Sequence, residues 1–77
     1  MPRNQPIRER IAETIRARIK SGEYPPGSKL PTEREVAAEF DCSLEPVKTA
    51  LDRLQTEGWV VGHQGRGRYV ADPLPRS

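Results

Sequence analysis

The chain has 77 residues, of which 31% are charged and 34% are hydrophobic, and its formal net charge is +2. This length allows one small domain, and a single core of this size rarely contributes more than about 3–5 kcal/mol. We therefore expect no second domain and no large buried catalytic pocket. The slight excess of basic residues does not by itself establish a nucleic-acid partner, so the placement of the charges has to be considered.

Several kinds of site are disfavoured by the scarcity of reactive residue types. Cys42 is the only cysteine, which excludes an intrachain disulfide and fits a reducing cytoplasm, so we expect a small packing residue there. His63 is the only histidine and has neither metal ligands at suitable spacing nor a nucleophilic partner. No apolar stretch approaches the roughly 18 residues of a membrane helix, and the N-terminal residues do not resemble a signal peptide. We therefore expect a cytoplasmic protein that is not an enzyme, with no metal, no cofactor and no membrane partner.

The first part of the chain predicts a flexible arm at residues 1–6 and then one amphipathic helix. Isoleucines recur every four residues from Ile7 to Ile19, which places them on one side of a helix. Gly22 is typical of the position just beyond a helix C-terminus, so the helix should end directly before it. Residues 23–27 contain two prolines and a glycine and therefore predict a turn.

Two shorter helices follow, separated by a tight turn at residues 41–42. Thr32 and Glu35 have the spacing of a capping box, in which each side chain accepts a hydrogen bond from the backbone N–H of the other residue. The second helix should begin at Thr32, and the third should be capped by Ser43 and end at Gly58. The residues expected to face the core are Val36, Ala37 and Phe40 in the second helix and Val47, Ala50, Leu51 and Leu54 in the third.

The last part of the chain predicts a β-hairpin. Residues 59–62 and 68–71 are rich in β-forming types and are joined by a segment with two glycines. Leu30 is a candidate for a short third strand, and residues 72–77 predict a linker-like tail. Two short helices, a tight turn and a hairpin are the parts of a winged helix-turn-helix, which places one helix in the DNA major groove and a loop in the adjacent minor groove.

Two short motifs make this prediction more specific. Residues 30–35 spell Leu-Pro-Thr-Glu-Arg-Glu, and residues 65–67 spell Gly-Arg-Gly. Over residues 7–71 the chain closely resembles the DNA-binding domain of the GntR family of bacterial transcription regulators, whose hallmark is Leu-Pro-Ser-Glu-Arg-Glu before the helix-turn-helix and Gly-Arg-Gly in the wing. The resemblance implies an α+β winged helix-turn-helix with three helices and a β-hairpin wing. It also implies sequence-specific binding to double-stranded DNA, with repression as the family's default.

The resemblance has further implications for partners. It implies a palindromic operator and a C-terminal domain that binds a small-molecule effector and dimerises. That effector-binding domain is absent from these 77 residues. We therefore expect the chain to be a monomer or a weak homodimer, with two copies pairing when DNA holds them close together.

The third helix should present its N-terminal residues to base edges in the major groove. The candidates for DNA contact there are Ser43, Leu44, Glu45, Pro46, Lys48 and Thr49. Leu44 replaces an arginine that is common in the family, and it can touch a thymine methyl group but cannot donate a hydrogen bond. Lys48 replaces a later family arginine and keeps the charge without the bidentate fork. Glu45 would repel phosphate but can accept a hydrogen bond from a cytosine amino group. The family's usual base preference is therefore not carried over to this chain.

Two other segments carry candidates for DNA contact. Thr32 and Arg34 stand at the start of the second helix, and Arg34 matches a family arginine that contacts DNA. The wing tip contributes Gln64, Gly65, Arg66 and Gly67. Glycines let the backbone approach the sugar-phosphate edge, so Arg66 can enter the minor groove. The alternatives are a solvated Arg34 paired with Glu33 and an ordinary glycine turn with exposed arginines.

A second class of function stays open on the sequence alone. The same fold can serve as a protein-interaction module that does not bind DNA. The apolar Leu44 and the acidic Glu45 on the predicted recognition helix favour this alternative. Absence of affinity for every DNA sequence tested at low salt would support it.

Overall fold

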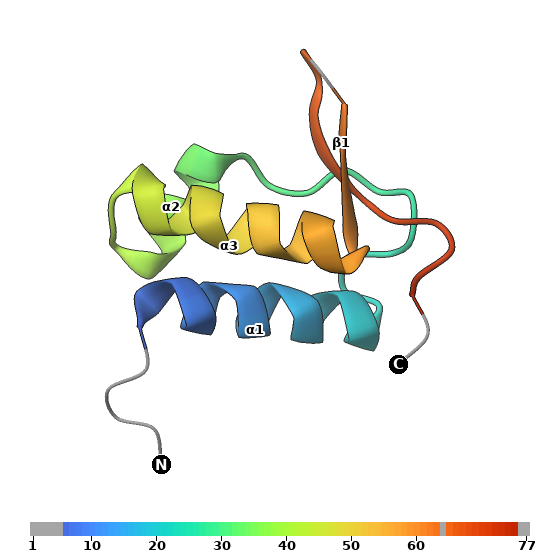
Figure 1. The fold of residues 1–77 in the computed structure, drawn as a ribbon, viewed down its shortest axis with the longest axis horizontal. Helices are drawn as coiled ribbons and strands as arrows, with labels where there is room; N and C mark the ends of the chain where they lie inside the picture. The colour runs from blue at the N-terminus through green and yellow to red at the C-terminus, as the bar shows by residue number, and fades with distance from the viewer. Residues whose placement is uncertain (1–5, 64, 76–77) are drawn as a thin grey trace.

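The computed structural model describes residues 6–63 and 65–75. Its regular elements, in chain order, are α1 (Ile7–Ser21), α2 (Glu33–Phe40), α3 (Leu44–Glu57), β1 (Val60–His63) and β2 (Gly67–Val70). α1 and α3 run side by side, α2 lies near one end of α3, and the hairpin of β1 and β2 rises from the other end (Figure 1). This arrangement confirms the predicted winged helix-turn-helix. Within the described ranges, no helix has the length and apolar character needed to cross a membrane.

The core lies between α1, α3 and the root of the hairpin. Ile11, Ile15 and Ile19 of α1 are at most 1% exposed, which confirms the helix face predicted from their four-residue spacing. They belong to one cluster with the buried residues of α3, namely Val47, Ala50, Leu51 and Leu54. Leu30 from the segment before α2, and Val60 and Val70 from the hairpin, belong to the same cluster, so the hairpin packs on the helices through this core.

α2 begins with the predicted capping box. Thr32 Oγ1 accepts from the Glu35 backbone N–H at 3.1 Å, and Glu35 Oε1 accepts from the Thr32 backbone N–H at 2.8 Å. Asp41 then takes a left-handed conformation, with φ at 53°, and its N–H bonds back to α2. This residue ends α2 and turns the chain into α3. Phe40, which was predicted to face the core, packs against it but is only partly buried.

The two ends of α3 are formed differently. Ser43 occupies the predicted N-cap position with an extended backbone, but its side chain makes no capping hydrogen bond. Ser43 is exposed, and water can satisfy the free N–H groups at this end of the helix. Pro46 is tolerated in the first turn because no helical bond is lost there. Gly58 ends the helix as predicted, with φ at 93°.

β1 and β2 pair antiparallel and form the wing, with Val60 opposite Val70. Both strands are displaced by one residue from the predicted ranges, 59–62 and 68–71. For β1 the reason lies at Trp59, whose backbone N–H bonds to the Leu54 carbonyl at 2.9 Å and closes the C-terminal turn of α3. The Trp59 N–H is therefore not available to the ladder, although the Trp59 carbonyl still accepts from the Ala71 backbone N–H at 2.9 Å.

The predicted third strand at Leu30 is reduced to a single bridge between Lys29 and Tyr69. Two backbone bonds flank this bridge: Leu30 N–H donates to the Arg68 carbonyl at 2.9 Å, and Val70 N–H donates to the Ser28 carbonyl at 2.8 Å. The segment before α2 is thereby fixed to β2, on the side opposite β1.

The ends of the domain are described only in part. Leu74 packs, partly buried, against the core, so a portion of the predicted tail contacts the domain. Residues 1–5 of the predicted arm, and residues 76–77 of the tail, lie outside the described residues.

Candidate nucleic-acid interface

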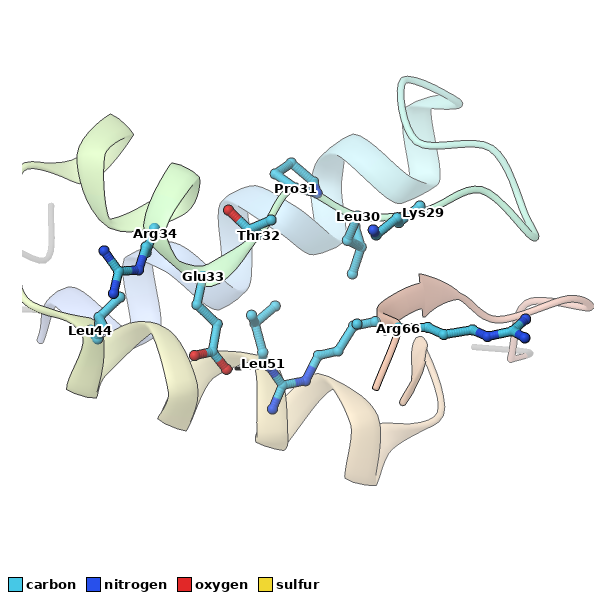
Figure 2. Close-up of a pocket in the computed structure, with 11 residues that line it drawn as sticks. Lys29, Leu30, Pro31, Thr32, Glu33, Arg34, Leu44, Leu51 and Arg66 are labelled. Carbon is cyan, nitrogen blue, oxygen red and sulfur yellow. Dashed lines mark hydrogen bonds and ion pairs between the residues drawn. The ribbon is translucent and has the colours of Figure 1, made fainter. Parts of the chain in front are cut away.

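Residues from the three predicted DNA-contacting segments line one groove. The groove has a volume of about 320 Å³ and lies between α2, α3 and the wing. Five of the predicted contact residues line it, namely Thr32, Arg34, Leu44, Arg66 and Gly67. Figure 2 shows Arg34 and Leu44 together at one end of this groove, while the Arg66 side chain extends away from them at the other end. Segments that are far apart in the sequence therefore meet at one surface.

The floor of the groove is apolar and its rim is basic. Leu30 and Leu51 are buried beneath it, at 4% and 1% exposure. Arg34 and Arg66 line it and are exposed, and they form no ion pair with any residue that the structure describes. Their positive charges are therefore available to an anionic partner.

The outward face of α3 continues the surface beyond the groove. Leu44, Glu45, Lys48 and Thr49 are exposed, and Pro46 is half-buried in the first turn. Leu44 is 37% exposed, which leaves an apolar side chain at the start of the helix in contact with solvent. These side chains lie opposite the buried face of α3, so they can enter a groove of DNA without disturbing the core.

The wing tip has the backbone freedom that was predicted for it. Gly65 and Gly67 have positive φ angles of 79° and 108°, which a residue with a Cβ rarely adopts. The Arg66 backbone N–H closes the turn by donating to the His63 carbonyl at 2.9 Å. Gln64, a further predicted contact, lies outside the described residues.

Two basic residues near the groove were not singled out as DNA contacts by the sequence analysis. Lys29 is exposed and lines the groove beside Gly67, where a Cβ on the glycine would lie 3.3 Å from Lys29 Cε. Arg68 also lines the groove, but its guanidinium is engaged by Glu33 of α2 at 2.6 Å and Asp52 of α3 at 2.7 Å. A signal for the inward direction of Arg68 was present, because it stands two residues before the buried Val70 on the same strand.

His63 takes part in packing on the wing. Its ring lies edge-on to Tyr69, with the ring centroids 4.9 Å apart. Within the described ranges, no group of three or more His, Cys, Asp or Glu residues could hold a metal ion. Cys42 is a free thiol that is partly buried against the core, in agreement with the packing role predicted for it.

Comparison with protein families gives a match over residues 7–70 to the bacterial regulatory proteins of the gntR family. The chain belongs to this family. This GntR domain is 41% identical over 68 residues to the transcriptional repressor NagR of Bacillus subtilis, a match that covers 88% of the chain and 28% of NagR. It is 39% identical over 66 residues to the arabinose metabolism transcriptional repressor of Geobacillus stearothermophilus, which covers 86% of the chain and 18% of that repressor. The chain thus spans less than a third of the length of these regulators.

A solved structure shows the same fold on DNA. The DNA-binding domain of AraR, in complex with operator ORX1, superposes on this GntR domain with a TM-score of 0.84 at 31% identity, over 87% of this chain and 81% of the AraR chain. The domain described above is therefore a winged helix-turn-helix domain of the GntR family, with the fold of the operator-bound AraR domain.

Proposed function

We propose that this domain binds operator DNA in a sequence-specific manner and represses transcription by occupying the site. α3 enters the major groove with Leu44, Glu45, Lys48 and Thr49, and the wing places Arg66 in the adjacent minor groove. Repression follows the two relatives named above, which are both repressors. The observation that carries the proposal is the shared groove, because it brings Arg34, the start of α3 and the wing to one surface.

The charges and shapes at this surface suggest a division of contacts. Arg34 at the start of α2 and Arg66 on the wing meet phosphates and the minor groove, which fixes the register of the domain on the duplex. Ser43 and Thr32 precede the first turns of their helices, where free backbone N–H groups favour a phosphate oxygen. The exposed residues of α3 meet base edges and therefore set the sequence preference.

The preferred bases should differ from those of relatives that carry arginine at the position of Leu44. Leu44 offers only an apolar contact, which suits a thymine methyl group. Glu45 accepts hydrogen bonds and suits a cytosine amino group, whereas Lys48 donates to a guanine or a phosphate. The site selected by this domain should accordingly contain thymine and cytosine at positions facing the start of α3.

Selection of bound duplexes from a random-sequence pool tests this proposal directly. We expect enrichment of a defined sequence whose affinity exceeds that of a scrambled duplex of the same composition. Absence of enrichment, together with no affinity for any duplex at low salt, would reject the proposal. That result would favour the alternative of a protein-interaction module, for which the exposed Leu44 is the supporting observation.

We also propose that two copies bind a palindromic operator although the free chain is monomeric or weakly dimeric. Leu44 and Val61 are the only large hydrophobic residues that are exposed in the described part of the chain, which gives little apolar surface for a stable dimer. Neighbouring half-sites would raise the effective concentration of the second copy. Sedimentation of the free 77-residue chain should give a monomer at micromolar concentration, and a single half-site should bind much more weakly than the palindrome. A tight dimer at nanomolar concentration would contradict this.

A further inference from the structure

Arg68 connects the wing to both helices of the helix-turn-helix. Its Nη1 donates to Glu33 Oε2 of α2 at 2.6 Å, and its Nη2 donates to Asp52 Oδ1 of α3 at 2.7 Å. The Arg68 side chain is only 20% exposed, so these bonds are partly shielded from solvent. Among the residues that the structure describes, no other side chain forms ion pairs with both α2 and α3. We call Arg68 with Glu33 and Asp52 the Arg68 clamp.

The backbone of Arg68 is fixed as well. Its carbonyl accepts from the Leu30 backbone N–H at 2.9 Å, so the segment leading into α2 is joined to β2 at the same residue. A guanidinium is planar and directs its donors at fixed angles. Both of its charge-assisted bonds can therefore form only while β2, α2 and α3 keep one relative placement.

We propose that Arg68 is a positioning residue for DNA recognition. The clamp holds the wing at a fixed angle to α3, so that Arg66 and the start of α3 reach neighbouring grooves at the same time. This inference rests on the proposed function, since it concerns how the two DNA-contacting elements are held. It has an unusual consequence: Glu33 and Asp52 assist DNA binding although their charges alone would oppose it.

The different exposure of the two carboxylates predicts that the two ion pairs of Arg68 contribute unequally to DNA binding. The Glu33 side chain is 27% exposed, whereas the Asp52 side chain is 68% exposed and better screened by water. Loss of the Arg68–Asp52 ion pair alone should weaken DNA binding by about threefold, which is the effect of an exposed ion pair. Arg68→Gln removes both ion pairs and should weaken DNA binding by about tenfold.

Whether Asp52→Ala weakens or strengthens DNA binding distinguishes a positioning role of Arg68 from a simple effect of net charge. The probe is the duplex enriched from the random pool by the unmodified chain, compared with a scrambled duplex over a range of salt concentrations. We expect Asp52→Ala to weaken binding to the enriched duplex although it removes a negative charge. Asp52→Ala added to Arg68→Gln should cause no further loss, because the bond is already absent. The salt slope of Arg68→Gln should stay within about half a unit of the unmodified chain.

The opposite pattern would overturn the inference. Tighter binding of Asp52→Ala to both duplexes, with a salt slope in Arg68→Gln lowered by about one unit, would mean that Arg68 contacts a phosphate directly. Arg16→Gln is the matched control, because Arg16 is 23% exposed and forms one ion pair, with Glu57 at 3.0 Å, that joins α1 to α3. This variant should bind both duplexes like the unmodified chain.

A measurement without DNA tests the Arg68 clamp separately from the proposed function. Amide hydrogen exchange at Leu30 and Val70 reports the two bonds that join the wing to the segment before α2. Exchange at both amides should be at least about threefold faster in Arg68→Gln than in Arg16→Gln at equal global stability. Equal exchange in the two variants would refute the clamp. Failure of the unmodified chain to enrich any duplex would instead refute the proposed function and leave the exchange result to decide the clamp.

Discussion

Arg66→Ala should change the salt dependence of DNA binding more than it changes sequence preference. Arg66 is exposed on the wing and has no ion-pair partner among the described residues, so its charge is available to a phosphate. Each neutralised phosphate adds about 0.9 to the slope of log affinity against log salt. Between about 50 and 200 mM salt, the affinity of the unmodified chain should therefore fall about 3.5-fold more than that of Arg66→Ala.

Lys48→Ala should behave differently, because Lys48 stands one turn into α3, where base edges are within reach. We expect a loss of about 1–3 kcal/mol on the enriched duplex and a much smaller loss on a scrambled one. Fluorescence anisotropy titrations of both duplexes across a salt series measure the two effects.

Arg53→Ala is the control for net charge, since Arg53 pairs with Glu57 and does not line the groove. Its salt slope should change by less than about half a unit. An unchanged slope in Arg66→Ala, or equal and unselective losses in the Arg66 and Lys48 variants, would refute the assignment of the wing to phosphates and of α3 to bases.

Three other variants test local features. Leu44→Arg should shift the preferred base towards guanine at one position of each half-site, and an unchanged preference in a base-by-base binding scan would show that Leu44 does not face the DNA. Thr32→Ala should lower the free energy of unfolding by about 1 kcal/mol in urea titrations, because it removes one half of the capping box. The hydrogen bond from Arg18 holds the pKa of Glu39 below its ordinary value of 4.5, so this pair contributes stability above that pH and the contribution is lost as the pH falls through the lowered pKa. Thermal unfolding from pH 7 to pH 3 should therefore show a smaller acid-induced loss in Arg18→Gln than in the unmodified chain.

The helices of this domain could be predicted because their signals are local. Ile11, Ile15 and Ile19 follow one another at the spacing of one helix face, and no distant residue is needed to interpret them. The capping box at Thr32 is equally local. Ser43 stands at the predicted N-cap position but makes no side-chain bond, because serine at this position permits the bond and does not enforce it when solvent can compete.

The separate segments of the candidate interface could be predicted from the sequence, but the contacts that hold them together could not. The exposed face of α3 follows from its buried face, and the Gly-Arg-Gly turn follows from its glycines. The partners of Arg68 could not be predicted, because Glu33 is thirty-five residues away and Asp52 is sixteen residues away in the sequence. Lys29 was missed for a related reason: only the pairing of its segment with Tyr69 brings it to the groove.

The distribution of ion pairs explains how a chain with a net charge of only +2 presents a basic surface. Glu57 is paired with Arg16 and Arg53, and Glu39 is paired with Arg18, away from the groove. At the groove, Arg68 pairs with both Glu33 and Asp52, whereas Arg34 and Arg66 form no ion pair in the described ranges.

Glu45 is the exception at this surface, because it is exposed in the first turn of α3 and forms no ion pair within the described part of the chain. A carboxylate at this end of a helix is stabilised by the helix dipole in the free protein. Against DNA the same charge is repelled by phosphates, and that cost is offset only where a base donates a hydrogen bond to it. Under the proposed function, Glu45 should therefore disfavour DNA sites that lack such a donor, which makes an acidic residue at the start of α3 compatible with selective DNA binding.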